Sequence, residues 1–316
     1  MLRWGFIGAG YVASRALAPA VHSSATAHLQ AVASRNPTLA SALNPTTTYS
    51  DYNALLADSA IDAIYISLPN HLHATWTIKA LNAGKHVLCE KPFATSLSDA
   101  TAMAEAATEN QRTLMEAIWF NFHPRTRRLI QLIESGELGE ILQINSSFSF
   151  QIDAPDNYRL KGDMGGGALL DLGPYLLHLW AGLTGNTSEI NYTQINQNFS
   201  GSAVDMTTTF TAEIDKTVLA NATASFIQAP KQEITINTQS ALIEFSEGEA
   251  FTNHNAPSAL TIAGHQESFA PVDPYQLMIE EFAAITQGKT NTIAALATTL
   301  QVTAQLEKIA ATSIRS

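Results

Sequence analysis

The chain has a single cysteine, Cys89, among its 316 residues, so it cannot form an intrachain disulfide. One thiol fits a reducing compartment. The sequence has no run of roughly 18 apolar residues that could cross a membrane, and no basic-then-apolar leader precedes the first apolar stretch. These absences lead us to expect a soluble, cytoplasmic protein that has no membrane segment.

Charged residues are scarce and unbalanced. They make up 14% of the chain, with 17 Lys and Arg against 28 Asp and Glu and a net charge of −11. An acidic chain without a Lys/Arg cluster is a poor partner for nucleic acid or for an anionic membrane. The low charge content also favours burial of some surface between subunits, and we expect a homo-oligomer, either a dimer or a tetramer.

Apolar residues make up 46% of the sequence, which is typical of a globular chain, and the length favours two domains. In the first 120 residues, predicted strands alternate with predicted helices, as in parallel βαβ units. The strands are Leu2–Ile7, His28–Ala33, Ala60–Leu68, His86–Cys89 and Thr113–Ala117, and the helices begin near Tyr11 and cover Ala74–Ala83 and Leu97–Asn110.

The pattern changes after residue 120. Helices are predicted at Pro124–Glu134, Ala168–Leu183, Tyr275–Gln287 and Thr290–Thr312, and strands of period two at Leu142–Phe150, Met206–Ile214, Val218–Phe226 and Glu233–Thr238. We therefore predict an α/β fold: an N-terminal Rossmann parallel sheet in residues 1–120 and a C-terminal α+β domain in residues 121–316. The second domain should hold an open, mostly antiparallel sheet, and its last helices can pack back on the first domain.

A glycine motif follows the first predicted strand. Gly8-Ala9-Gly10-Tyr11-Val12-Ala13 fits G-x-G-x-x-G/A at the start of a helix. In this motif Gly8 permits a tight turn, Gly10 lets backbone amides approach a pyrophosphate, and Ala13 permits close packing of helix on strand. The helix N-terminus adds positive potential. The motif predicts a dinucleotide site, and the alternative is a plain βα turn.

The end of the second predicted strand distinguishes the two nicotinamide dinucleotides. A carboxylate there accepts from the ribose 2′-hydroxyl of NAD, whereas a 2′-phosphate needs donors. No Asp or Glu stands between His28 and Asp51, and the expected position holds Ser34 and Arg35. A hydroxyl and a guanidinium favour NADP, with NAD still possible. The alternative for Arg35 is a solvated surface side chain.

Three polar loops follow later predicted strands. They are Ser67-Leu68-Pro69-Asn70-His71-Leu72-His73, Cys89-Glu90-Lys91-Pro92 and Met115-Glu116-Ala117. Because ligands bind beyond the carboxyl ends of parallel strands, these loops should line one crevice. Together with the glycine motif they resemble the glucose–fructose oxidoreductase/inositol dehydrogenase (Gfo/Idh/MocA) family, whose most specific mark is Glu90-Lys91-Pro92.

The second half extends the resemblance over nearly the whole chain. Asn157-Tyr158-Arg159-Leu160 and the glycine-rich segment 165–175 resemble the approach to the family's active-site helix. Tyr175, with Asp171 four residues earlier, resembles the branch of dihydrodiol dehydrogenase and NADP-dependent D-xylose dehydrogenase. Asn121 stands where that branch commonly has an arginine. The branch's mode of substrate recognition is therefore not carried over to this chain at this position.

The resemblance implies which residues serve the site. The cofactor-binding set is Gly8, Ala9, Gly10, Tyr11, Val12, Ser34, Arg35, Leu68, Pro69, Asn70, His73, Glu90, Lys91 and Trp119. The substrate set is Lys91, Asn121, Arg159, Asp171, Tyr175 and His178. The family needs no metal. His71 and His73 are expected to shape the nicotinamide loop, because no third ligand stands near them.

Lys91, Asp171 and Tyr175 fit the interconversion of an alcohol and a carbonyl. With a cofactor that exchanges the hydride, the protein must handle one proton and position the substrate. A tyrosine, whose pKa is ordinarily about 10, becomes a usable acid/base when a lysine ammonium favours its phenolate. We expect Tyr175 to be the acid/base, Lys91 its electrostatic partner and Asp171 the orienting group, although the sequence also permits Lys91 to relay the proton.

Each of these residues also has a structural alternative. Lys91 can be a solvated loop residue, Tyr175 a packed aromatic, Asp171 a capping or ion-pairing group, and His178 an interior histidine. The function we favour is an NADP-dependent oxidoreductase acting on an aldose or a cyclic vicinal diol. The alternatives are a non-catalytic dinucleotide-binding sensor or repressor, and a lyase or glycosidase that recycles NAD(P) within one cycle. Retention of Lys91, Asp171 and Tyr175 favours the oxidoreductase over these alternatives.

Overall fold

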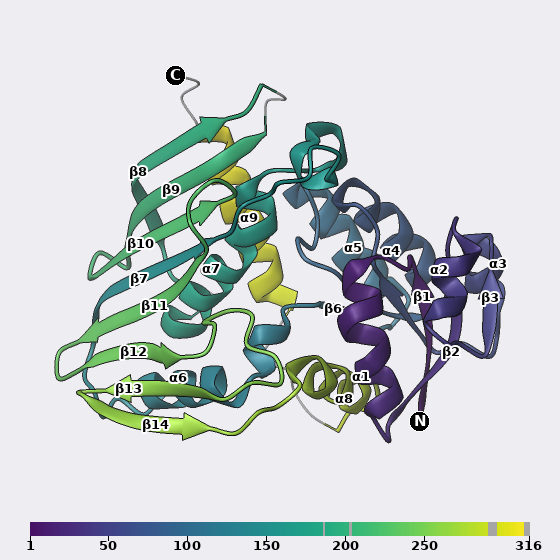
Figure 1. Cartoon of the computed structure of the whole chain (residues 1–316), viewed down its shortest axis with the longest axis horizontal. Coiled ribbons are helices and arrows are strands. Elements are labelled where there is room, and N and C mark those ends of the chain that lie inside the picture. Colours follow the sequence, from purple (N-terminus) through teal and green to yellow (C-terminus); the bar gives the residue numbers. More distant parts are fainter. Residues whose placement is uncertain (186, 202–203, 290–295, 313–316) are drawn as a thin grey trace. The chain divides into compact units, whose positions relative to one another are not determined.

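The computed structural model of the chain describes residues 1–185, 187–201, 204–289 and 296–312. The chain divides into two compact units (Figure 1). The first unit comprises Met1–Trp119 and Asp273–Leu300, and the second comprises Phe120–Val272 and Gln301–Ser316. The last helix, predicted at Thr290–Thr312, is observed as α9 at Leu296–Thr312. Residues 290–295 of that prediction lie outside the described residues.

A six-stranded sheet with every strand parallel forms the first unit. Its order is β3 (Thr47–Tyr49), β2 (Ala27–Ala33), β1 (Leu2–Ile7), β4 (Ala63–Ile66), β5 (His86–Cys89) and β6 (Leu114–Glu116). This confirms the Rossmann prediction. The strand order reverses between β1 and β4, and such a switch point is where open α/β sheets bind ligands.

The sheet departs most from the sequence prediction at β4 and at β3. The predicted strand Ala60–Leu68 is shorter, because Ala60 N donates to Asp58 Oδ1 at 2.7 Å in a turn before β4. The edge strand β3 was not predicted, because its three residues give too short a pattern.

Helices cover both faces of the parallel sheet. α3 (Tyr52–Ala57), α4 (His73–Asn82) and α5 (Leu97–Glu109) share one apolar cluster with Ile64 and Ile66 of β4. On the other face, Trp4 of β1 contacts Phe282 of α8 (Pro274–Thr286), with ring centroids 5.1 Å apart. The remaining helical segments of this unit are the π-helical η1 (Ala13–Leu17), α1 (Ala18–Ser23), α2 (Pro37–Ala42) and the 3₁₀ turn η2 (Asn70–Leu72).

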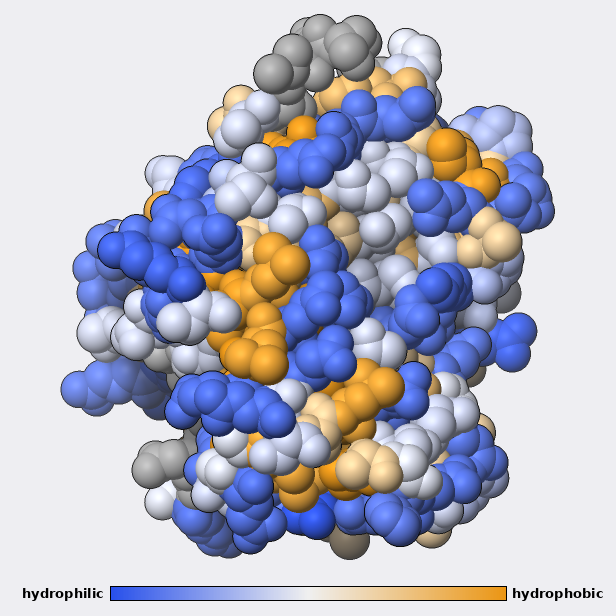
Figure 2. Space-filling view, turned by 90° about the vertical axis from the view of Figure 1, so that its left-hand side faces the viewer, coloured by the Kyte–Doolittle hydropathy of each residue, from blue (hydrophilic) through white to orange (hydrophobic). Residues whose placement is uncertain are grey.

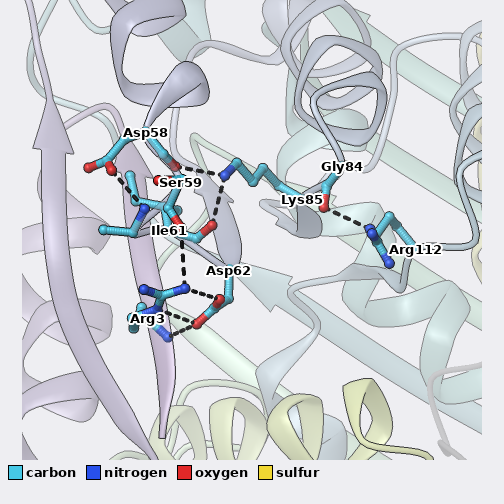
Figure 3. Close-up of polar contacts among 9 residues, drawn as sticks. Arg3, Asp58, Ser59, Ile61, Asp62, Gly84, Lys85 and Arg112 are labelled. Atoms are coloured by element: carbon cyan, nitrogen blue, oxygen red, sulfur yellow. Dashed lines mark hydrogen bonds and ion pairs between the residues drawn. The ribbon is translucent and has the colours of Figure 1, made fainter.

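One ion pair and one buried lysine hold the amino-terminal end of this sheet, where its strands begin (Figure 3). Arg3 Nη2 lies 2.7 Å from Asp62 Oδ1, and Arg3 Nε donates to Asp62 Oδ2 at 2.9 Å. Lys85 Nζ donates to the carbonyls of Asp58 and Ile61 at 2.7 and 2.8 Å. Each of Arg3, Asp62 and Lys85 stands where a strand begins, so this end joins the starts of β1, β4 and β5.

The second unit holds an eight-stranded sheet that is antiparallel except where β10 pairs with β7. In order across the sheet, its strands are β14 (His265–Phe269), β13 (Ser258–Ile262), β12 (Leu242–Glu247), β11 (Lys231–Thr238), β7 (Ile141–Ser149), β10 (Val218–Ser225), β9 (Asp205–Ile214) and β8 (Ile190–Phe199). The mostly antiparallel sheet was predicted. The period-two pattern of β7, β9 and β10 buries one face of each strand.

The buried face of that sheet packs on α7 (Ala168–Thr184), and α6 (Pro124–Glu134) contacts β13. α7 is apolar around most of its circumference, as expected for a helix buried in a core. The opposite face of the sheet is polar: Asn221 Nδ2 donates to Asn145 Oδ1 at 3.0 Å and Thr211 Oγ1 to Asn221 Oδ1 at 2.9 Å. Short 3₁₀ turns complete the chain: η3 (Trp119–Phe122), η4 (Tyr158–Leu160) and η5 (Gly162–Met164).

The side of the molecule where this sheet lies mixes polar and apolar residues, and the apolar ones form a broken band (Figure 2). Leu219 of β10 and Leu242 of β12 lie on the polar face of the sheet and are 43% and 41% exposed. No described helix is long and apolar enough to pass through a bilayer.

Candidate active site

The glycine loop lies at the switch point, after β1. Gly8 has a φ of +101°, and a Cβ there would lie 2.2 Å from the Ser67 carbonyl oxygen, so the fold itself requires glycine. At Gly10 the nearest atom to a Cβ would be Ser67 Oγ at 3.7 Å, an ordinary contact. Protein packing therefore does not explain Gly10. The motif instead assigns Gly10 to the close approach of a pyrophosphate to the backbone.

Ser34 and Arg35 follow β2 directly. Ser34 is buried, and its Oγ accepts from Asn36 N at 3.1 Å, which leaves the hydroxyl proton for another acceptor. Arg35 is exposed. Asn36 caps α2 by accepting from Thr38 N and Leu39 N. Consecutive residues of this turn thus carry one hydroxyl and one guanidinium, and no carboxylate stands beside them in the sequence.

A buried carboxylate organises the loop that carries Lys91. Glu90 Oε1 accepts from the Tyr65 hydroxyl at 2.6 Å, and Glu90 Oε2 accepts from Lys91 N at 3.3 Å. Burial raises the pKa of Glu90, although the Tyr65 hydrogen bond and the charge of Lys91 act in the opposite direction. Glu116 Oε1 accepts from Phe93 N at 3.0 Å. Two carboxylates thus fix the backbone on either side of Lys91-Pro92.

His73 links two of the predicted cofactor loops. Its Nδ1 lies 2.8 Å from the Pro92 carbonyl oxygen and its Nε2 lies 2.9 Å from the Leu68 carbonyl oxygen. Burial lowers the pKa of His73, against the two carbonyls that favour its charged form. The side chain is completely buried, so it connects these two loops from the interior of the protein. Trp119 is also buried and stacks on Tyr275, with ring centroids 4.5 Å apart.

In the second unit, the start of α7 is fixed by a strand residue. Asp205 Oδ2 accepts from Leu169 N at 2.8 Å and from Thr208 Oγ1 at 2.6 Å. Gly167, which precedes the helix, has a φ of +119°, and a Cβ there would lie 2.1 Å from Asp205 Oδ1. The buried carboxylate therefore acts as a helix cap supplied from β9, since the preceding glycine has no side chain to cap with.

Asp171 and Tyr175 lie one turn apart on α7, and both are buried. Asp171 Oδ2 is 2.8 Å from Arg159 Nε. The Tyr175 ring packs among Phe120, Phe148 and Phe251, with ring centroids 5.9, 5.5 and 6.1 Å away. The helix thus presents an ion-paired carboxylate next to a tyrosine held in an aromatic cluster.

The predicted residues divide between the two units. The whole cofactor set, with Lys91, lies in the first unit, and Asn121, Arg159, Asp171, Tyr175 and His178 lie in the second. Within the second unit, Arg159, Asp171 and Tyr175 come together, while Asn121 and His178 are buried. No group of three His, Cys, Asp or Glu side chains among the described residues could hold a metal ion.

Two supporting residues, Tyr65 and Asp205, were not predicted from the sequence. Tyr65 lies in an apolar run, and the sequence gives no sign that it differs from the other residues of a buried strand. Asp205 lies 36 residues from Leu169, the residue whose amide it caps, so no local capping pattern could reveal it.

Comparison with known proteins places both parts of the chain in described families. Residues 2–118 match the "Oxidoreductase family, NAD-binding Rossmann fold", and residues 126–250 match the "GFO/IDH/MocA C-terminal domain". The chain is 34% identical over 300 residues to D-xylose 1-dehydrogenase (NADP(+)) 2 of Haloferax volcanii, covering 92% of this chain and 90% of that protein.

Two further relatives are reductases. A dTDP-3,4-didehydro-2,6-dideoxy-alpha-D-glucose 3-reductase of Streptomyces violaceoruber is 37% identical over 188 residues, which cover 58% of this chain and 55% of that protein. Among solved structures, a 3-ketoreductase from Actinomadura kijaniata in complex with NADP and TDP-benzene matches with a TM-score of 0.90 and 25% identity. That match covers 99% of this chain and 98% of the other.

Proposed function

Because the chain belongs to the GFO/IDH/MocA oxidoreductase family, we propose that it is an NADP-dependent oxidoreductase that transfers a hydride between the nicotinamide and an aldose or a cyclic vicinal diol. The observation that carries this proposal is the combination of Ser34-Arg35, with no carboxylate beside it, and a lysine, an aspartate and a tyrosine in the positions of the family motifs. The NADP-dependent D-xylose dehydrogenase relative supports both the cofactor and the sugar.

The first unit fits this cofactor. Packing within the protein does not require glycine at position 10, and the missing side chain there suits a close approach of the pyrophosphate. The Ser34 hydroxyl and the Arg35 guanidinium suit a 2′-phosphate. Ala9, Tyr11 and Val12 continue that loop, while Leu68, Pro69, Asn70, His73, Glu90 and Trp119 complete the set on the nicotinamide side. When bound, NADP supplies the hydride chemistry.

The protein's own task is then to move one proton and to orient the substrate. We assign the proton to Tyr175 and the supporting positive charge to Lys91, which the Glu90 and Glu116 hydrogen bonds hold in a fixed loop. Asp171 orients the substrate hydroxyl. Asn121, Arg159 and His178 are the further substrate-side residues.

We also propose the organisation and setting of the enzyme. Residues 1–120 form the NADP-binding domain, and residues 121–316 form the domain for substrate binding and oligomerisation, with the C-terminal segment Asp273–Leu300 packing back on the NADP-binding domain. The half-exposed Leu219 and Leu242 on the sheet face turned away from α7, together with the low charge content, support a homodimer or tetramer. The single buried thiol, Cys89, supports a cytoplasmic location. Light scattering of the purified protein measures the oligomeric state.

The test is a panel of aldoses, inositols and cyclic diols assayed with NADP⁺ and with NAD⁺. We expect one class of substrate to be oxidised with stoichiometric formation of NADPH, and NADP⁺ to be preferred over NAD⁺. Absence of turnover throughout, with NADPH still bound, would favour a sensor. Conversion of a substrate without net NADPH would favour internal recycling of the cofactor.

A further inference from the structure

We propose that Arg159 is a positioning residue that holds the Asp171 carboxylate ionised and in one orientation, so that the enzyme selects substrates bearing a hydroxyl next to the reacting carbon. The inference rests on the proposed function and goes beyond it by naming the substrate feature that is recognised. The side chains concerned all belong to the second unit.

The contact itself is an ion pair with a nearly buried carboxylate. Arg159 Nε donates to Asp171 Oδ2 at 2.8 Å, and the two side chains are 26% and 6% exposed. A carboxylate with so little contact to water stays ionised only when a charged donor compensates it. Burial lowers the pKa of Arg159, but Asp171, Tyr158 and Tyr175 outweigh it, and the pKa lies above its usual value. Arg159 is therefore a permanent cation at this position.

Arg159 is anchored to the same loop that begins α7. Arg159 N donates to the Asn157 side chain at 3.1 Å, and the Arg159 carbonyl accepts from Gly167 N at 2.8 Å. A Cβ at Gly166 would lie 2.4 Å from that carbonyl oxygen, so the backbone approach is close. The guanidinium carbon also lies 4.9 Å from the centre of the Tyr158 ring. The Arg159 backbone thus contacts Gly167, just before α7, and its side chain contacts Asp171, one turn further along.

This arrangement determines what Asp171 can recognise. An ionised carboxylate accepts hydrogen bonds and cannot donate them, so Asp171 suits a substrate hydroxyl, which donates. A site built around a buried polar group rejects an analogue that lacks its partner, because the group is then left unpaired. Tyr175, one turn further along the same face of α7, places this recognition beside the proposed proton transfer.

The experiment compares hydroxylated sugars with their 2-deoxy counterparts, D-ribose with 2-deoxy-D-ribose and D-glucose with 2-deoxy-D-glucose. Steady-state kcat and KM are measured for wild type, Arg159→Met, Arg159→Lys, Asp171→Asn and the double variant Arg159→Met/Asp171→Asn. Wild type should prefer the hydroxylated sugar. Arg159→Met should lose about 10- to 150-fold in kcat/KM on that sugar, the size of one hydrogen bond to a charged group, and roughly threefold or less on the deoxy sugar.

The other variants separate positioning from mere folding. Arg159→Lys keeps the charge and should recover part of the discrimination, whereas in the Asp171→Asn background Arg159→Met should add no further loss of discrimination. Arg128→Met is the matched control, because it removes a comparable ion pair to Glu267 at 3.0 Å on the surface of the same unit. Urea unfolding of the four variants of the Arg159/Asp171 cycle gives a readout independent of activity, in which the two losses of stability should not add.

Three outcomes overturn the inference. Equal losses on the hydroxylated and deoxy sugars in Arg159→Met would make Arg159 a purely structural residue. Additive losses in both the unfolding and the kinetic cycles would mean that the two side chains act independently. Wild type that is inactive on every sugar and diol would instead refute the proposed function, and the role of Arg159 would fall with it.

Discussion

The first unit carries most of its candidate residues on loops beyond strand ends, whereas the second carries Asp171, Tyr175 and His178 on one helix. In the first, Glu90 and Glu116 hold the backbone around Lys91 by accepting from Lys91 N and Phe93 N. In the second, Asp205 accepts from Leu169 N and holds the start of the helix that bears Asp171 and Tyr175. In both units, therefore, a buried carboxylate accepts a hydrogen bond from a backbone amide. In the first unit this contact fixes a loop, and in the second it fixes the start of a helix.

The difference bears on how each half tolerates change. A loop at a parallel strand end is positioned by the sheet, so its reactive side chain can be replaced without loss of fold. A helix that begins at a glycine and is capped by a distant strand depends on that one junction. We therefore expect side-chain changes in the first unit to affect chemistry or cofactor choice, and changes at the junction in the second to affect stability as well.

The largest effect should come from Lys91→Met. Removing the cation from the loop should lower kcat by about 10³-fold, within the range for a positioned proton-transfer group, while NADPH binding stays nearly unchanged. Turnover and NADPH fluorescence titration measure the two quantities. Lys79→Met removes an exposed lysine over the Trp76 ring in the same unit and should leave both unchanged. Near-normal turnover in Lys91→Met would refute the proposed role of the lysine.

Next in size is Gly167→Ala at the junction of the second unit. Its Cβ would meet Asp205 Oδ1, and the residue would be held at positive φ, so we expect a loss of about 3 kcal/mol in the free energy of unfolding by urea. Gly185→Ala is the control. It follows the same helix, has a φ of +91° and meets no atom within 4 Å, and it should cost about 1 kcal/mol. Equal losses would mean that the Asp205 cap is not the cause.

A smaller and more selective effect is expected for Arg35→Ala. Loss of the guanidinium should raise KM for NADP⁺ by about tenfold or more and leave KM for NAD⁺ nearly unchanged, because NAD has no 2′-phosphate. The ratio of kcat/KM for the two cofactors measures it. Arg112→Ala, whose Nε donates to the Gly84 carbonyl near the opposite edge of the sheet, should not change that ratio (Figure 3). Equal weakening of both cofactors by Arg35→Ala would remove the 2′-phosphate argument.

The smallest effect should come from Asp62→Asn at the amino-terminal end of the parallel sheet. The Arg3 hydrogen bond lowers the pKa of Asp62 below its usual value, so the pair stabilises the fold above a pH of about 4 and loses that effect as the pH falls through the lowered pKa. Asp62→Asn should lower the melting temperature at pH 7 by about 2 °C. The difference from wild type should shrink below a pH of about 4. Asp156→Asn, on an exposed loop, should show no such trend, and a constant difference for Asp62→Asn would contradict the ion-pair assignment.

Local patterns predicted most of the fold. The alternation of apolar runs with helices and the later period-two runs are local patterns in the sequence, and the two observed sheets confirm the strands that they predicted. The edge strand β3 and the trimmed start of β4 escaped prediction, because a three-residue strand and a turn closed by Asp58 have almost no periodicity.

The candidate residues were also proposed from the sequence, because motif spacing places them at strand ends and on one face of a helix. The contacts that hold them in place were not. Tyr65 on Glu90, His73 between Leu68 and Pro92, Arg159 on Asp171 and Asp205 at the start of α7 are contacts across 5 to 36 residues of chain. Such pairs depend on how elements pack, and no local spacing encodes them.

By itself, then, the sequence determined the class of both sheets, the family and the residue types that favour NADP and proton transfer, because these follow from periodicity and from short motifs whose backbone geometry is local. Only the tertiary structure decided which groups hold those residues in place. Burial makes an unpaired carboxylate, amide or imidazole costly, so each one finds a partner wherever the folded chain supplies it. That partner belongs to another element, and the fold alone brings the two together.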